Sequence, residues 1–87
     1  MSYYLDKSQF LKFFDTEKLQ DPWVDYILTQ SDFRLEISLL AVEEWVGILL
    51  WKNDQKDWLF DANIHHVEKI NFETENGELT IKINVLM

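Results

Sequence analysis

The chain has 87 residues, which is enough for one domain and too few for two hydrophobic cores. It contains no cysteine, so disulfides and thiolate metal sites are excluded, and its 47% hydrophobic content argues against disorder. Its 16 acids and 8 bases give a formal net charge of −8, which disfavours nucleic acids and anionic membranes as partners because both are negatively charged.

The first third of the chain is predicted to be helical. In SQFLKFFDTEKL, residues 8–19, apolar residues recur at helical spacing, and either Ser8 or Asp6 is suitable as the N-cap. In the following segment, QDPWVDYILTQS, Asp21 is a suitable N-cap and Pro22 suits the first helical position. We therefore expect two short helices, or one helix and a turn, before the first strand.

From Phe33 onwards the hydrophobic period changes to two, which is typical of half-buried strands. FRLEISL alternates apolar and polar residues, WVGILLW is rich in strand-forming residues, and DWLF follows as a short third segment. The last stretch contains Asn76-Gly77, a strong hairpin signal. The prediction is a single α+β domain over residues 1–87, with one or two N-terminal helices packed on one face of a four- to five-stranded antiparallel sheet, a meander of hairpins.

Tight turns between these strands determine which residues are paired and which share a face. The expected pairs are Leu35–Leu50, Ile37–Ile48, Leu39–Val46, Leu49–Phe60, Trp51–Trp58, Lys52–Asp57, Ile70–Ile83 and Phe72–Ile81. One face of the sheet is then aliphatic and is expected to seat the helices. The opposite face is aromatic and charged, and no element is left over to cover it. Its expected members are Arg34, Glu36, Ser38, Trp45, Gly47, Leu49, Trp51, Trp58 and Phe60.

The aromatic face is a candidate binding surface, because large exposed apolar patches usually mark interfaces and tryptophan often dominates binding energy. Acids around it would form a polar rim. The predicted partner-binding residues are Trp45, Trp51, Trp58, Phe60, Glu36, Glu43, Glu44, Asp54 and Asp57. The alternative is that the same tryptophans are core residues, since a sheet can curl and a one-residue slip of register would turn them inward.

DANIHHVEK is the one stretch whose composition suits acid–base or metal chemistry, through Asp61, His65 and Glu68. Adjacent residues of a strand point to opposite faces, so His65 and His66 could not bind one ion from regular β structure. The sequence has no H-x-x-x-H, C-x-x-C or G-x-S-x-G motif and no glycine-rich phosphate loop. We therefore predict a protein that is not an enzyme and has neither a cofactor nor a metal site.

These features predict a protein–protein interaction module, specifically a small acidic inhibitor that blocks a basic partner, such as a toxin or nuclease, by occlusion. Size, acidity and lack of motifs are compatible with bacterial immunity proteins of toxin–antitoxin type, an analogy of class and not of family. Two alternatives are a homo-oligomer that dimerises through the aromatic sheet face and a phage-type acidic decoy that mimics nucleic acid.

The sequence also carries an expectation about location. The N-terminal residues lack the layout of a signal peptide, and the longest apolar runs are far shorter than the roughly 20 residues of a membrane helix. We therefore expect a cytoplasmic protein with no membrane or nucleic-acid partner.

Overall fold

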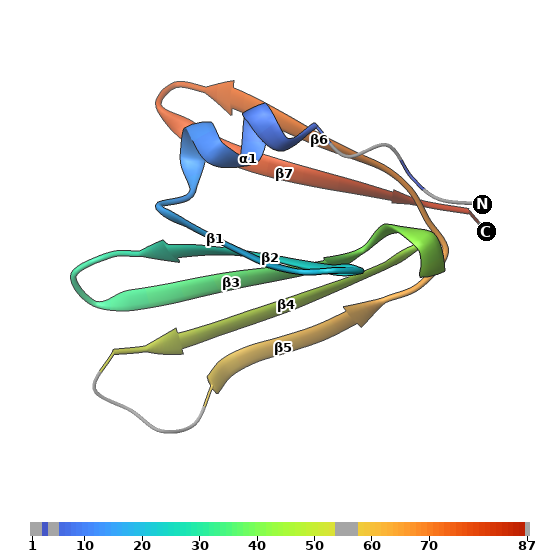
Figure 1. The fold of residues 1–87 in the computed structure, drawn as a ribbon. Coiled ribbons are helices and arrows are strands. Elements are labelled where there is room, and N and C mark those ends of the chain that lie inside the picture. Colours follow the sequence, from blue (N-terminus) through green and yellow to red (C-terminus); the bar gives the residue numbers. More distant parts are fainter. Residues whose placement is uncertain (1–2, 4–5, 54–57, 87) are drawn as a thin grey trace.

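The computed structural model of the chain describes residues 3, 6–53 and 58–86. A short helix precedes a five-stranded antiparallel meander, in the order β1-β2-β3-β4-β5, and a separate hairpin of β6 and β7 follows it (Figure 1). The elements are α1 (Lys7–Phe13), β1 (Thr16–Gln20), β2 (Trp23–Thr29), β3 (Phe33–Leu40), the 3-10 turn η1 (Ala41–Glu43), β4 (Trp45–Lys52), β5 (Trp58–Ile64), β6 (Val67–Glu75) and β7 (Glu78–Val85). The predicted small α+β fold with an N-terminal helix and an antiparallel sheet is confirmed. The predicted membership of the sheet is wrong, because the meander contains β1 and β2 in place of the last hairpin, which forms a sheet of its own.

The predicted second helix is wrong, because its segment forms β2. Asp21 and Pro22 are the two residues between the paired ends of β1 and β2, and not the start of a helix. The segment WVDYILT is rich in β-branched and aromatic residues, which fit a pleated sheet better than a helix. Its alternate residues Val24, Tyr26 and Leu28 face the core.

The first predicted helix is confirmed only for its first half. Asp6 is the N-cap, and its Oδ1 accepts a hydrogen bond from the Ser8 amide at 3.1 Å. After α1 the chain is tied to β2, because the Asp15 amide donates to the Ile27 carbonyl at 3.0 Å and the Asp15 carboxylate accepts from the Thr29 amide at 2.8 Å. These bonds place the next residues alongside β2, where they become β1 instead of continuing the helix.

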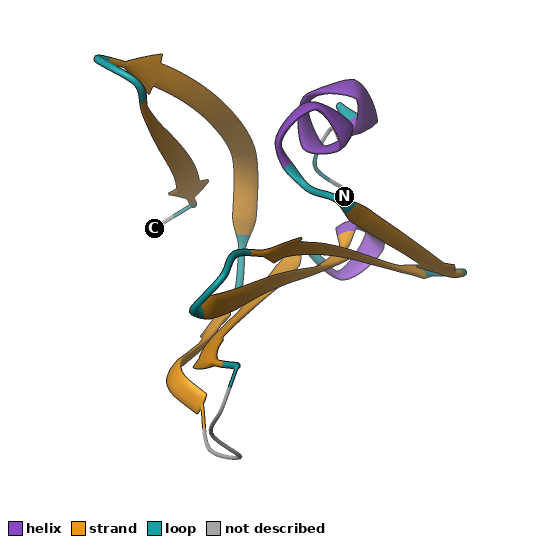
Figure 2. Ribbon diagram, turned by 90° about the vertical axis from the view of Figure 1, so that its left-hand side faces the viewer, coloured by secondary structure: helices purple, strands orange, loops and turns teal. Residues whose placement is uncertain are grey.

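The helix and the β6–β7 hairpin lie on the same side of the five-stranded sheet (Figures 1 and 2). Phe10 of α1 joins these layers, since its ring centroid is 4.5 Å from that of Tyr26 on β2 and 4.6 Å from that of Phe72 on β6. The buried core that results comprises Tyr3, Phe10, Phe14, Tyr26, Ile37, Leu39, Val46 and Val67. The expectation that the aliphatic face seats the N-terminal helix is therefore confirmed.

Strand register follows the predictions in the β3–β4 and β6–β7 hairpins, where each expected pair is observed. In the β4–β5 hairpin Trp51 pairs with Trp58 as expected, but a bulge places the extra residue Leu59 between the paired positions. Phe60 consequently pairs with Leu50, so the predicted Leu49–Phe60 pair is wrong. Phe60 lies on the face away from Trp51.

Two further expectations concern the turn between β4 and β5 and the placement of the last hairpin. The predicted Lys52–Asp57 pair involves Asp57, which lies outside the described residues. The last hairpin does not extend the meander, because the chain turns at His66, whose φ is 59°, and β6 and β7 pair only with each other in the described part of the chain.

Candidate protein-binding face

The side of the sheet away from α1 and the hairpin carries a layer of large side chains. Three cross-strand rows on β2, β3 and β4 place them there, because residues directly opposite each other share a face. We call the following set the tryptophan face: Trp23, Arg34, Glu36, Trp45, Leu49 and Trp51. Apart from η1 at one end, no helix or strand of the described residues covers it (Figures 1 and 2).

At one end of the tryptophan face two indoles pack on each other. The Trp45 ring lies over Gly47, so close that a Cβ atom at position 47 would be 2.5 Å from the Trp45 Cη2 atom. Trp23 meets Trp45 edge-to-face, with ring centroids 5.2 Å apart and planes at 82°, a favoured aromatic geometry. Trp23 is still 40% exposed. The pair is thus ordered by its neighbours and partly open to solvent.

At the other end Arg34 stacks on Trp51. The guanidinium carbon lies 4.7 Å from the centre of the Trp51 ring, within the range of a cation–π contact. Arg34 also forms a loose ion pair with Glu36, with 3.9 Å between Nη2 and Oε2. The Arg34 Nε atom is buried and has no hydrogen-bond partner among the described residues. Trp51 is half-buried beneath this arrangement.

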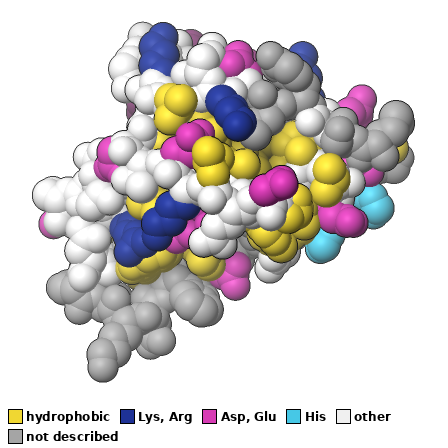
Figure 3. Space-filling view, viewed as in Figure 1, with side chains coloured by type: hydrophobic (Ala, Val, Ile, Leu, Met, Phe, Trp, Pro, Cys, Tyr) yellow, Lys and Arg dark blue, Asp and Glu magenta, His cyan; other side chains and the backbone are white. Residues whose placement is uncertain are grey.

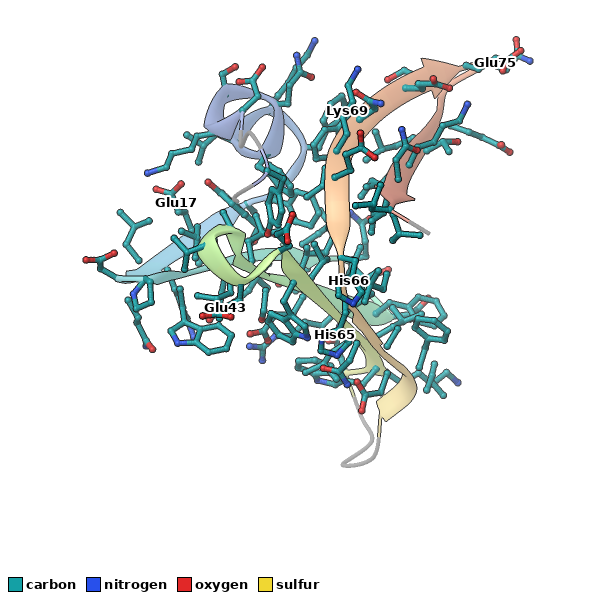
Figure 4. The ribbon with its side chains drawn as sticks, turned by 90° about the vertical axis from the view of Figure 1, so that its right-hand side faces the viewer. Glu17, Glu43, His65, His66, Lys69 and Glu75 are labelled. Carbon is teal, nitrogen blue, oxygen red and sulfur yellow. The ribbon has the colours of Figure 1, made fainter. Side chains whose placement is uncertain are left out.

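The structure brings together three of the predicted partner-binding residues, Glu36, Trp45 and Trp51, on one face. Glu43 is exposed on η1 (Figure 4). Glu44 follows in a left-handed conformation with φ 55° and directly precedes Trp45 in the chain. Phe60 belongs to the opposite face, as its pairing with Leu50 requires.

The remaining predicted residues lie in the β4–β5 connection. The backbone of Trp58 pairs with Trp51. Outside the described part of the structure lie the side chain of Trp58 and the two residues Asp54 and Asp57.

Sequence reasoning missed Trp23, because it assigned that residue to a helix. The available signal was the alternation of Val24, Tyr26 and Leu28 with Trp23 and Asp25, which is typical of a strand. With β2 recognised, the pair Val24–Leu39 puts Trp23 one residue before it, level with Leu40, which pairs with Trp45, and the Trp23 and Trp45 rings are in contact.

Charged groups of both signs share this side of the sheet. Asp25, Glu36 and Asp61 are placed there by their pairs, as are Lys18 and Arg34. Figure 3 shows hydrophobic side chains as patches separated by acidic and basic ones over the sheet. Aromatic side chains interspersed with charged groups of both signs are a common composition of a protein interface.

The histidine-containing segment lies at a corner of the fold. His65 and His66 are exposed at the corner between β5 and β6 (Figure 4), and the His66 carbonyl accepts a hydrogen bond from the Leu86 amide at 2.8 Å. No group of three or more histidine, cysteine, aspartate or glutamate residues is placed to hold a metal ion in the part of the chain that the structure describes. Nor does any described helix have the length and apolar character required to cross a membrane.

Comparison with known proteins adds no relative. No protein-family model matches the chain, and no curated protein or solved structure is significantly similar to it.

Proposed function

We propose that the chain is a protein-interaction module that binds a basic protein through the tryptophan face and inhibits it by occlusion. The observation that carries this proposal is the sheet face on which Trp23 and Trp45 lie at one end and Trp51 at the other, opposite the face that holds the main core cluster. Aromatic side chains on an exposed patch are common anchors of protein interfaces.

The tryptophan face is suited to binding because its large side chains are already held in place. Trp45 is restrained by Trp23 and by its close fit over Gly47, and Trp51 is restrained by Arg34. Side chains that are ordered before association lose less conformational entropy when they bind. The rings also rest on hydrogen-bonded strands and not on a loop, which fixes their spacing.

The charge of the chain supports a basic partner. A net charge of −8 attracts a positively charged surface from a distance and raises the association rate, whereas buried indoles slow dissociation. Glu36 within the tryptophan face and Glu43 on η1 supply local carboxylates. The proposed partner is therefore a basic protein, with a toxin or a nuclease as the class we favour.

Site-specific photo-crosslinking in the cells that make the protein tests this proposal. A photo-reactive p-benzoylphenylalanine at Leu49 stands in the tryptophan face, and the same group at Thr80 stands on the exposed outer side of the hairpin as a matched control. We expect a specific basic protein to be captured from position 49 and not from position 80. Equal capture from both positions, or capture of acidic proteins alone, would contradict the proposal.

A further inference from the structure

The outer edge of β5 is open. β5 is the last strand of the meander, and no described strand pairs with its outer side (Figure 1). Such an edge presents backbone N–H and C=O groups that another strand can use. Leu59 and Phe60 on this strand are each 52% exposed, so apolar side chains accompany the free backbone groups.

The two edges of the same sheet differ in how they are protected. β1 has five residues and carries Glu17 and Lys18, and short charged edge strands resist pairing with other chains. β5 has seven residues, WLFDANI, with no lysine, arginine or proline and with Asp61 as its one charged residue. The bulge at Leu59 interrupts only its first part. The segment from Phe60 to Ile64 is therefore the least protected edge of the meander.

We propose that β5 pairs antiparallel with β5 of a second copy of this chain, about a two-fold axis at Ala62. This register places Phe60 opposite Ile64, an aromatic and β-branched pair of the kind that stabilises antiparallel strands. It also places Asp61 opposite Asn63, so a carboxylate faces an amide that can donate to it. Ala62, a small residue, meets its own copy on the axis.

Neighbouring registers are less favourable for the same strand. An axis at Asp61 places two carboxylates directly opposite each other, which is destabilising. An axis at Phe60 places Asp61 opposite Leu59, so the charge loses its polar neighbour. An axis at Asn63 shortens the overlap within the strand, because β5 ends at Ile64. The sequence of β5 thus selects the axis at Ala62.

This dimer goes beyond the proposed function and uses a different surface. A two-fold axis perpendicular to the sheet keeps both tryptophan faces on the same side of a continuous ten-stranded sheet. An interface made by one strand edge is small, which is typical of weak association. Both copies carry a charge of −8, so added salt should strengthen the dimer, whereas it should weaken binding to a basic partner.

Sedimentation equilibrium of the whole chain provides the first test. Between roughly 10 μM and 1 mM, the range of weak interfaces, the average mass should rise from 10.5 kDa towards twice that value, and more steeply at high salt. A mass that stays at 10.5 kDa up to roughly 1 mM at high salt would overturn the dimer. That result would leave the proposed function intact, because the tryptophan face is not part of this interface.

Two pairs of variants test the register. The natural chain has no cysteine, so Ala62→Cys can form a disulfide only with another copy, and paired Cα atoms of antiparallel strands lie within disulfide range. Asn63→Cys is the control, since the two residues at that position are offset along the strand. We expect Ala62→Cys to form a disulfide-linked dimer in a time during which Asn63→Cys forms little of it. Equal cross-linking at the two positions would contradict the register.

The second pair changes charge. Asn63→Asp puts a carboxylate opposite Asp61 and should weaken association at least several-fold. Asn84→Asp makes the same change in net charge at an exposed position of β7 and should have a much smaller effect. If Asn84→Asp weakens association as much as Asn63→Asp does, the edge of β5 is not the interface.

Discussion

Gly47 determines how the Trp45 indole lies on the sheet. The ring covers the glycine at a distance that leaves no room for a methyl group, and this position also brings Trp45 into contact with Trp23. Any larger residue at position 47 must turn the indole away from the sheet. The orientation of a key residue of the tryptophan face thus depends on a glycine two positions along the same strand.

Gly47→Ala should therefore destabilise the fold by about 1–3 kcal/mol, the usual cost of overpacking. Urea unfolding would measure the loss, and tryptophan fluorescence should shift to longer wavelength as the Trp45 ring becomes more exposed. The matched control is the same substitution combined with Trp45→Leu. It should cost little beyond Trp45→Leu alone, because the obstructing ring has gone. If Gly47→Ala costs as much stability in the Trp45→Leu background as it does in the wild type, the Trp45 ring is not what the added methyl group meets.

Two buried tyrosines give the fold a dependence on alkaline pH. The Tyr3 hydroxyl donates to the Trp45 carbonyl at 2.9 Å, and burial raises the pKa of Tyr3 to about 12. Burial also raises the pKa of Tyr26, and its hydrogen bond to the Glu17 carboxylate at 2.6 Å and the charge of Glu17 add to that rise. In both cases folding favours the neutral phenol over the phenolate.

Stability should be fully present below pH 10, where tyrosine in the unfolded chain is neutral, and should fall as the pH rises from 10 towards 12. Urea unfolding at pH 8, 10 and 11 would measure this loss. Tyr3→Phe should cost about 1 kcal/mol at pH 8, through the lost hydrogen bond, and should make the loss above pH 10 smaller. A wild-type stability that is the same at pH 8, 10 and 11 would contradict this account.

At the scale of elements, α1 depends on its packing. Its seven residues are too few for a helix that is stable in isolation, so the helix persists because Phe10 and Phe14 are buried on the sheet and hairpin. Phe10 of α1 contacts the rings of Phe14 at the C-cap, Tyr26 on β2 and Phe72 on β6, so it joins the helix, the sheet and the hairpin in the core.

Phe10→Ala should cost about 3–5 kcal/mol, a large share of the stability of a small domain. Circular dichroism and urea unfolding would report the loss of structure. Leu11→Ala is the control on the same helix, because Leu11 is 54% exposed, and its cost should stay below about 0.5 kcal/mol. A similar cost for both substitutions would mean that α1 does not anchor the hairpin through Phe10.

The elements also show where sequence reasoning reaches its limit. The β3–β4 and β6–β7 pairs were predictable with their register, because alternation gives the faces and tight turns give the pairing. β2 was mistaken for a helix because Asp21-Pro22 is as suitable for a turn as for a helix start. The bulge at Leu59 has no signature in WLFD, and it reverses the face of Phe60.

The same reasoning explains how much of the candidate site was predictable. Trp45, Trp51 and Glu36 follow from alternation on β3 and β4 once the chain is turned at residues 41–44, between these strands. Trp23 comes from a strand that depends on tertiary pairing with β3, which local sequence does not specify. The contact between Trp23 on β2 and Trp45 on β4 crosses the intervening strand β3 and is therefore visible only in the folded sheet.

At the scale of the whole molecule, the two faces of the sheet differ. The helix and the hairpin pack on one face and form the main buried cluster there (Figure 2). On the opposite face Ile27, which pairs with Glu36, is buried, whereas Trp23, Trp45 and Trp51 are half-buried or exposed among charges of both signs. A small sheet with one open aromatic face and a net charge of −8 fits a protein in which a bound partner covers that face.

The affinity of Trp51→Ala for the basic protein captured from position 49 tests the central claim most directly. A buried tryptophan anchor is worth about 2 kcal/mol or more, so calorimetric titration should show a loss of roughly 30-fold in affinity, with the variant still folded by circular dichroism. Leu11→Ala, on the other side of the molecule, should bind as the wild type does. Unchanged affinity in Trp51→Ala would contradict the assignment of the tryptophan face as the binding surface.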